Sequence, residues 1–218
     1  MENRLKEILS SIARDGSLFE EAVLAAKERQ KILAKPTGAL GRLEDISVQI
    51  AGITGKIKNE ITKKAIIIMS ADNGVVEEGV ASAPQSVTLS QTINFIRGLT
   101  GVSSIAKHFA IDLLVVDMGV KLPIPDSLYT DTPFEDGRLT KKILKRSIAR
   151  GTNNLAAGPA MTRDQALTAI LEGVACAQAV KICGYDILGV GEMGIGNTTT
   201  SSCVLAALTK SKASDVVG

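Results

Sequence analysis

A single carboxylate inside a glycine-rich stretch is the feature of the sequence that most suggests chemistry. Residues 185–208 read YDILGVGEMGIGNTTTSSCVLAAL, and Glu192 is the one acid among closely spaced glycines. Glycine lets the backbone approach an anion closely, because no Cβ intervenes. An apolar helix capped by Asn197 would add unpaired N–H groups and a partial positive charge at its first turn. The stretch therefore predicts a phosphate-binding loop. Its expected residues are Gly194, Gly196, Asn197 and Thr198.

Other interpretations of this stretch stay open. A tight turn followed by a capped helix uses the same residue types and needs no ligand. The sequence GVGEMG also matches the dinucleotide pattern G-x-G-x-x-G, but the match comes late in the chain and has an acid inside the loop. A P-loop is excluded, because no lysine follows the last glycine. Glu192 is either a solvated acid or a group that holds a ribose hydroxyl or faces a cationic ring, because its charge would otherwise repel a phosphate.

Three apolar runs along the chain end in short polar loops. They are AIIIMSAD (65–72), IDLLVVDMGV (111–120) and YDILGVG (185–191). Continuous apolar runs of this length are typical of strands buried on both faces of a parallel sheet. Such sheets bind ligands outside the carboxyl ends of their strands, so the loops after the three runs are expected to meet at one site. The acids in these loops are Asp72, Asp117 and Glu192.

Segments with helical periodicity separate the apolar runs. Helices are expected in residues 3–34 with a break at Gly16, and around residues 43–53, 92–99, 102–110 and 162–183. Thr162 and Gln165 form a capping box at the start of the last helix. Alternating strands and helices predict an α/β fold, a Rossmann-like three-layer domain built on a parallel sheet. We expect a helical N-terminal region at 1–60 and an α/β nucleotide-binding domain at 61–218.

Composition narrows the possible classes of function. The 218 residues are 45% hydrophobic and 22% charged, with a formal net charge of +2, which fits a globular protein without a basic surface for nucleic acid. Aromatic residues make up 3% of the chain and Trp is absent, so base-stacking surfaces are not expected. No apolar run approaches the ~20 residues of a membrane span, and no apolar signal segment is visible at the N-terminus. We expect a cytoplasmic protein.

Metal and thiol chemistry are not expected either. His108 is the single histidine, so a histidine-based metal site or catalytic triad is hard to build. Asp117 and Asp126 have no third ligand at a suitable spacing, and we predict no metal site and no cofactor. The three cysteines lack paired spacing and are expected to be reduced and mostly buried. They are Cys176, Cys183 and Cys203.

Five segments occur in the order and approximate spacing of one known family. They are KPTGALGRLE, SADNGVVEEGVASAPQSVT, VVDMGV, RGTNNLAAGPAMT and GEMGIGNTTT. With these motifs the chain resembles the nicotinate-nucleotide–dimethylbenzimidazole phosphoribosyltransferases, which take part in assembly of the cobalamin lower ligand. The resemblance implies transfer of the phosphoribosyl group of nicotinate mononucleotide to a benzimidazole-type base. Nicotinate leaves, α-ribazole 5'-phosphate forms, and the anomeric carbon is inverted. A homodimer without a metal is also implied.

The resemblance assigns residues to the site as well. Glu192 matches the family's glutamate beside the ribose, and the four loop residues named above match its phosphate site. Gln91 matches a glutamine in the pocket for the incoming base, and Asp72 matches an acid at the end of its strand. Two departures concern this pocket. Asn73 stands where the family often has a histidine, and the pocket serine is matched by Ser82, one position further on. We expect these departures to shift the preference for the lower-ligand base.

The family's general-base glutamate has no match in this sequence after Thr200. The resemblance therefore implies a fragment or truncated form, incomplete at the C-terminus and weakly active or inactive. A non-catalytic nucleotide-binding protein is the first alternative. An NAD-dependent oxidoreductase, based on GVGEMG, is the second.

Overall fold

A computed structural model describes residues 1–217, and the chain divides into two compact units. The helical unit is Met1–Ile61, and the sheet unit is Thr62–Gly218. In the described part of the chain, no helix is both long enough and apolar enough to cross a membrane.

The helical unit contains three helices. They are α1 (Glu2–Asp15), α2 (Glu20–Ile32) and α3 (Arg42–Thr54). The predicted break at Gly16 is confirmed, because α1 ends just before this residue. Helices α2 and α3 pack through Ala22, Ala26 and Ala51, whose short side chains let the two backbones come close together.

A partly buried ion pair closes the turn between α2 and α3. Lys35 Nζ donates to Glu44 Oε1 at 2.7 Å, and the Leu40 amide donates to the same oxygen at 3.0 Å. The side chains of Lys35 and Glu44 are only 12% and 14% exposed. The hydrogen bond from Lys35 is the main cause that lowers the pKa of Glu44 below its usual value, and the bond from the Leu40 amide adds to it. The motif KPTGALGRLE thus forms a turn that is held by an ion pair between its first residue, Lys35, and its last residue, Glu44.

This pair predicts a pH dependence of stability. A carboxylate with a lowered native pKa stabilises the folded chain above its unfolded pKa, about 4.5, and this contribution disappears as the pH falls through the native pKa. We expect Glu44→Gln to flatten the loss of thermal stability below that pH, followed by circular dichroism. The control is Glu28→Gln, which removes an ion pair to Lys31 whose side chains are 70% and 65% exposed. If thermal stability falls with decreasing pH equally in Glu44→Gln and in the parent chain, the Lys35–Glu44 pair does not stabilise the fold.

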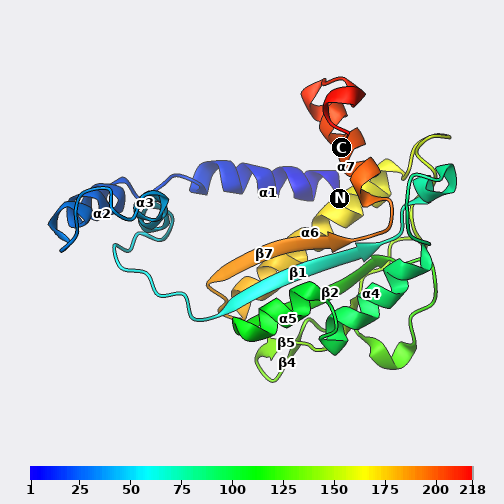
Figure 1. Ribbon diagram of the computed structural model, residues 1–218, viewed down its shortest axis with the longest axis horizontal. Helices are drawn as coiled ribbons and strands as arrows, with labels where there is room; N and C mark the ends of the chain where they lie inside the picture. Colours follow the sequence, from blue (N-terminus) through cyan, green and yellow to red (C-terminus); the bar gives the residue numbers. More distant parts are fainter. Residues whose placement is uncertain (218) are drawn as a thin grey trace. The chain divides into compact units, whose positions relative to one another are not determined.

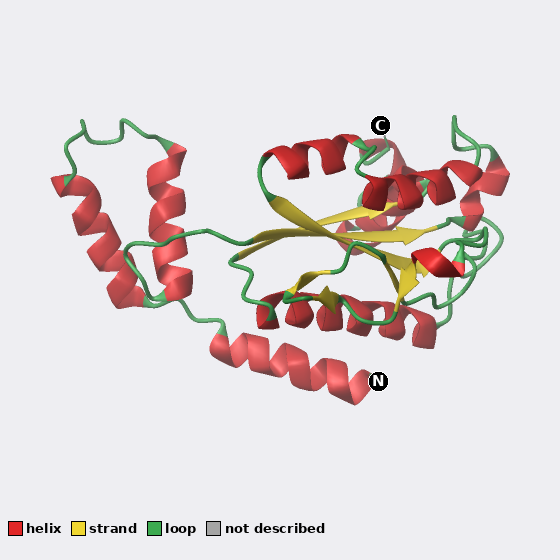
Figure 2. Ribbon diagram, turned by 90° about the horizontal axis from the view of Figure 1, so that it is seen from below, coloured by secondary structure: helices red, strands yellow, loops and turns green. Residues whose placement is uncertain are grey.

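The sheet unit is built on a five-stranded parallel sheet, so the predicted α/β fold is confirmed. The strand order is β3-β6-β2-β1-β7, and α4 and α5 cover one face while α6 covers the other (Figures 1 and 2). The strands are β1 (Lys64–Ala71), β2 (Ile111–Gly119), β3 (Tyr129–Thr130), β6 (Ile143–Lys145) and β7 (Ile187–Met193); β4 (Phe134–Glu135) and β5 (Arg138–Leu139) form a separate antiparallel pair. The helices are α4 (Ser86–Arg97), α5 (Gly101–His108), α6 (Arg163–Ile182) and α7 (Asn197–Thr209), with short 3-10 turns at Gly74–Glu78, Asp126–Leu128 and Ala213–Asp215.

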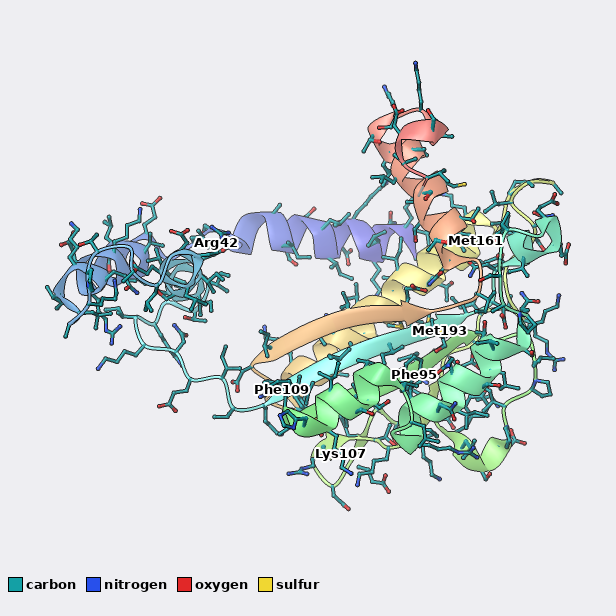
Figure 3. All side chains as sticks on the ribbon, viewed as in Figure 1. Arg42, Phe95, Lys107, Phe109, Met161 and Met193 are labelled. Carbon is teal, nitrogen blue, oxygen red and sulfur yellow. The ribbon has the colours of Figure 1, made fainter. Side chains whose placement is uncertain are left out.

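Alternating side chains of the central strands fill two cores. Leu114 and Val116 of β2 face α6, where they join Cys176 and Val180. Val115 points to the opposite face and packs in a second core together with Phe95 of α4, which Figure 3 labels, and other α4 side chains. Fully burying such a side chain contributes about 2 kcal/mol. The continuous apolar sequence of β2 is therefore explained by burial on both faces.

Some predicted boundaries in this unit are wrong. Helix α4 begins at Ser86 and not near residue 92, because Thr88 and Thr92 are buried and interrupt the apolar pattern of the helix. Gly101 was expected to separate two helical segments, but it is the first residue of α5; the break is at Gly98, which has a φ of 76°. The capping box of α6 is confirmed, with both Thr162 and Gln165 in place.

Candidate functional site

The carboxyl ends of three strands meet at one edge of the sheet. In the register of the sheet, Ser70 of β1 lies between Asp117 of β2 and Met193 of β7. The loops that follow these strands are therefore neighbours, although more than a hundred residues separate the first from the last. This edge is where a parallel sheet places its ligands.

Glu192 lies in β7, which corrects the expectation that it lies inside a loop. The strand continues to Met193, and Glu192 pairs with Met69 of β1. Its side chain is exposed, and Oε1 accepts a hydrogen bond of 2.5 Å from Asn197 Nδ2. The strand also includes Gly189 and Gly191. These two glycines therefore form part of the sheet and not a turn, which removes the structural basis of the dinucleotide pattern.

Two positions of the glycine loop, residues 194–197, favour glycine over any residue with a side chain. A Cβ on Gly194 would lie 2.1 Å from the carbonyl oxygen of Ala71 and 2.8 Å from Asn73 Nδ2. Gly196 has a φ of 84°, a conformation that side chains disfavour. The close fit of Gly194 against the end of β1 and the backbone conformation of Gly196 therefore explain these glycines without any ligand.

Helix α7 begins one residue earlier than predicted. Gly196 occupies the N-cap position, so the expectation that Asn197 is the N-cap is wrong, and Asn197 is the first helical residue. Its Oδ1 accepts from the Thr198 amide at 2.8 Å while its Nδ2 reaches Glu192. One side chain therefore joins the first turn of α7 to the acid in β7.

Some amides of the loop already have partners. The Ile195 amide donates to Thr88 Oγ1 at 3.1 Å, and the Asn197 amide donates to Gly194 O at 3.0 Å. Within residues 1–217, the amides of Gly196 and Thr199 make no hydrogen bond to the protein. Both amides belong to the N-terminal end of α7, where a helix favours an anion. Gly196 and Thr199 therefore supply two unpaired donors at the start of α7.

Asn73 connects the loop to three other segments. Its Nδ2 donates to Ile195 O at 3.1 Å, its Oδ1 accepts from Thr200 Oγ1 at 3.4 Å, and its carbonyl accepts from Gln85 Nε2 at 3.2 Å. From the sequence, Asn73 was noted only because the family often has a histidine at this position. A polar side chain directly after a parallel strand was the signal that could have shown its role.

Asn73→Ala is expected to destabilise the sheet unit and to weaken binding of inorganic phosphate. Two side-chain hydrogen bonds are lost, at about 1 kcal/mol each. Denaturant unfolding and phosphate titration would measure the two effects. Asn94→Ala is the control, because the Asn94 side chain makes no hydrogen bond in the described part of the chain. Parental stability and phosphate affinity in Asn73→Ala would show that this residue does not hold the loop.

Two predicted acids are buried at the same edge. Asp72 is 1% exposed; its Oδ2 accepts from the Lys121 amide at 2.7 Å, and its Oδ1 has no hydrogen-bond partner within residues 1–217. Asp117 accepts from the amides of Gly119 and Val120 and from Tyr129 Oη at 2.5 Å. Burial and this contact raise the pKa of Tyr129 far above its usual value. Both acids organise loops, and among residues 1–217 no three acidic, cysteine or histidine side chains are grouped to hold a metal.

The structure brings together only part of the predicted site. Glu192 contacts Asn197 of the glycine loop, whereas Asp72 is buried after the end of β1 and contacts the segments that contain Gly119, Lys121 and Thr152. Gln91 is half-buried in α4, one turn after Thr88, which holds the loop. Ser82 is exposed before α4, and no contact joins it to the other predicted residues in the described chain.

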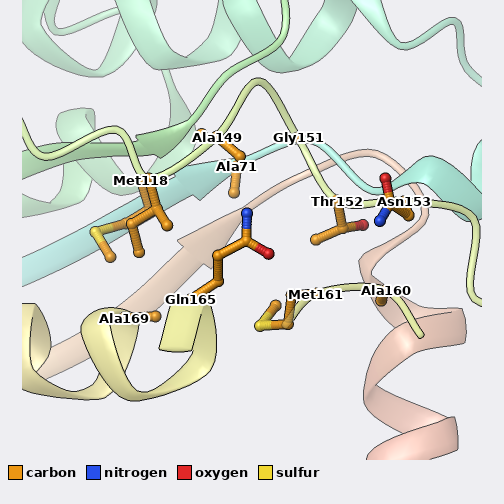
Figure 4. A pocket seen from close by; sticks show the side chains of 12 residues that line it. Ala71, Met118, Ala149, Gly151, Thr152, Asn153, Ala160, Met161, Gln165 and Ala169 are labelled. Carbon is orange, nitrogen blue, oxygen red and sulfur yellow. The ribbon is translucent and has the colours of Figure 1, made fainter. Parts of the chain in front are cut away.

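A cavity of about 160 Å³ lies between the sheet and the start of α6 (Figure 4). None of the predicted site residues lines it. Its walls come from the ends of β1 and β2, from the segment RGTNNLAAGPAMT, and from α6. Sequence reasoning identified this segment as a motif but assigned it no role, because no local pattern indicates a cavity that four segments build together.

Comparison with known proteins identifies the family. The phosphoribosyltransferase family matches residues 17–218. The nicotinate-nucleotide–dimethylbenzimidazole phosphoribosyltransferase of Clostridium perfringens is 47% identical over 98% of this chain and 55% of its own length, and that of Acetivibrio thermocellus is 46% identical over 93% and 54%. The crystal structure of CobT from Thermus thermophilus superposes with a TM-score of 0.82 at 37% identity, over 91% of this chain and 56% of that one.

The chain spans about half the length of the curated relatives it matches. Identity above 40% over nearly the whole chain and the superposition on a solved structure confirm the resemblance found in the motifs. The chain belongs to the nicotinate-nucleotide–dimethylbenzimidazole phosphoribosyltransferase family.

Proposed function

We propose that this chain forms the nucleotide-binding part of an enzyme that transfers the phosphoribosyl group of nicotinate mononucleotide to a benzimidazole-type base. The products are nicotinate and α-ribazole 5'-phosphate. One observation carries the proposal: Glu192 is held by Asn197 directly beside two unpaired amides at the start of α7. This arrangement places a carboxylate next to a group of donors that can bind an anion. The names of the relatives supply the substrates.

The chemistry follows from these groups. The amides of Gly196 and Thr199 bind the phosphate and so fix the ribose. The glycosidic C–N bond breaks, and its electron pair stays on the pyridine nitrogen, so nicotinate leaves with a neutral ring nitrogen. Positive charge develops on the ribose, and the carboxylate of Glu192 stabilises it. The unprotonated ring nitrogen of the incoming base forms the new bond with its lone pair, and the proton on the other ring nitrogen passes to a general base.

Calorimetry with nicotinate mononucleotide, combined with chromatographic detection of nicotinate, tests the proposal. We expect saturable binding, and nicotinate release that depends on added dimethylbenzimidazole. Binding without release would identify a non-catalytic nucleotide-binding protein. Binding of NAD without binding of nicotinate mononucleotide would overturn the proposal in favour of the dinucleotide interpretation.

The specificity for the base and the assembly state are part of the same proposal. Ser82 and Gln91 are proposed to lie in the pocket for the incoming base, as the resemblance implies, and Asp72 is proposed as a further substrate-binding residue at the end of its strand. A homodimer is proposed because the helical unit exposes large apolar side chains, such as Ile32 at 84% and Leu24 at 63%. Sedimentation velocity should give a dimer mass, and a monomer mass at all concentrations would contradict it.

A further inference from the structure

The hydroxyl group of Thr88 is a buried polar group between α4 and the glycine loop. Thr88 is 0% exposed and lies in the first turn of α4. Its Oγ1 accepts a hydrogen bond of 3.1 Å from the Ile195 amide, and this bond joins residues 107 positions apart. Valine has nearly the same shape as threonine, so packing alone does not require a hydroxyl at a fully buried position. The loop amide that it holds explains the hydroxyl.

This bond fixes the orientation of one peptide group of the loop. The amide of Ile195 and the carbonyl of Gly194 belong to the same planar, trans peptide group, so they point in opposite directions. Thr88 holds the amide, and the carbonyl accepts from the Asn197 amide at 3.0 Å. Thr88 therefore acts on the first residue of α7 through a single rigid peptide plane.

The next peptide group is held in the same way from a different segment. The Ile195 carbonyl accepts from Asn73 Nδ2 at 3.1 Å, and the same plane carries the Gly196 amide, which makes no hydrogen bond within residues 1–217. Glycine restricts the rotation of its backbone less than any other residue, so these planes are not fixed by local sterics alone. Two contacts from outside the loop, one from α4 and one from the end of β1, hold the direction of a donor that can bind an anion.

The same series of contacts reaches Glu192. Asn197, whose amide is bound to the Gly194 carbonyl, also holds the Glu192 carboxylate through its side-chain Nδ2. Loss of the acceptor at Thr88 would free the peptide plane between Gly194 and Ile195 to rotate. The hydroxyl in α4 is thus linked to both the start of α7 and the acid.

We propose that Thr88 is a positioning residue for the anion site, because its hydroxyl oxygen holds the Gly194–Ile195 peptide in the orientation that directs the loop amides toward a phosphate. The inference rests on the proposed function, in which this phosphate belongs to a ribose phosphate. Thr88 contacts no substrate atom in this role. It acts only through the loop, so its replacement lowers the affinity for phosphate without removing any donor from the site.

Thr88→Val tests this role, because valine keeps the shape of the side chain and removes the acceptor. The affinity for inorganic phosphate, measured by calorimetry, should fall by about tenfold through the loss of one hydrogen bond to the loop. Thr88→Ser keeps the acceptor and should restore the affinity to within about twofold of the parent. Thr92→Val is the matched control. Thr92 is also 0% exposed in α4, but its hydroxyl donates to the Thr88 carbonyl within the same helix.

Hydrogen exchange in the parent chain gives a second test that needs no variant. The Ile195 amide should exchange much more slowly than the amides of Gly196 and Thr199, which make no hydrogen bond within residues 1–217. Equally fast exchange of all three amides would show that Thr88 does not hold the loop, and would overturn the inference.

The outcomes separate this inference from the proposed function. If the parent chain binds phosphate and nicotinate mononucleotide, and Thr88→Val binds phosphate with parental affinity, the inference is wrong while the proposed function stands. Equal weakening in Thr88→Val and Thr92→Val, or no recovery in Thr88→Ser, would indicate a general packing effect and would also overturn it. If the parent chain binds neither ligand, both proposals fail.

Discussion

Gly194→Ala is expected to abolish binding of inorganic phosphate and to destabilise the sheet unit by several kcal/mol, about 3 or more. The added Cβ would lie 2.1 Å from the Ala71 carbonyl oxygen and 2.8 Å from Asn73 Nδ2, and contacts under 3.0 Å essentially never occur at a Cβ. The nearest atom belongs to the backbone of β1, so the strand end or the glycine loop must move. The two amides at the start of α7 would then lose their fixed positions. Denaturant unfolding and phosphate titration measure these effects.

Gly173→Ala is a matched control for this substitution. Gly173 lies in α6, and a Cβ there meets no atom within 4 Å. Alanine in place of a helical glycine should stabilise the chain by up to about 1 kcal/mol and leave phosphate binding unchanged. If Gly194→Ala keeps both stability and phosphate affinity, the close fit of the loop against β1 is not what shapes the site.

Glu192→Gln is expected to separate binding from catalysis. The carboxylate repels a nearby phosphate, so its removal should tighten binding of inorganic phosphate by roughly fivefold, about 1 kcal/mol after screening by solvent. The same change removes the group that stabilises positive charge on the ribose, and nicotinate release should slow by about 10²-fold to 10³-fold. Glutamine preserves the shape of the side chain, so the start of α7 should stay in place.

The measurements for Glu192→Gln are phosphate calorimetry and the rate of nicotinate release, with Glu135→Gln as the control. Glu135 is exposed in the β4–β5 pair and makes no contact with the glycine loop in the described residues. An unchanged rate of release would exclude Glu192 from the chemistry. Weaker phosphate binding would show that Glu192 helps to bind the anion, for example by orienting Asn197.

The central strands and the longest helix could be predicted from the sequence because local patterns determine them. The apolar runs of β1 and β2 require burial on both faces, and the Thr162 capping box fixes the start of α6. The short strands β3 and β6 could not be predicted. They have two and three residues, too few for any periodicity, and they exist only through pairing with each other and with β2.

The meeting of three strand ends at one edge of the sheet was predicted correctly, but the local geometry around Glu192 and the start of α7 was not. The position of Glu192 depends on how far β7 pairs with β1, and this pairing joins residues more than a hundred positions apart. The cap of α7 falls on Gly196 because its left-handed backbone turns the chain into the helix, which no residue pattern distinguishes from a cap at Asn197. Asn73 and the cavity act between segments, so only the fold shows them.

Amide NMR of the sheet unit within the full chain, titrated with inorganic phosphate, tests the central claim most directly. The account predicts that the amide signals of Gly196 and Thr199 shift most, saturate together, and lose their response in Gly194→Ala. The amide of Ile195, which is bound to Thr88, should shift much less. Saturable binding that leaves the start of α7 unchanged and shifts amides at another part of the chain would contradict the account.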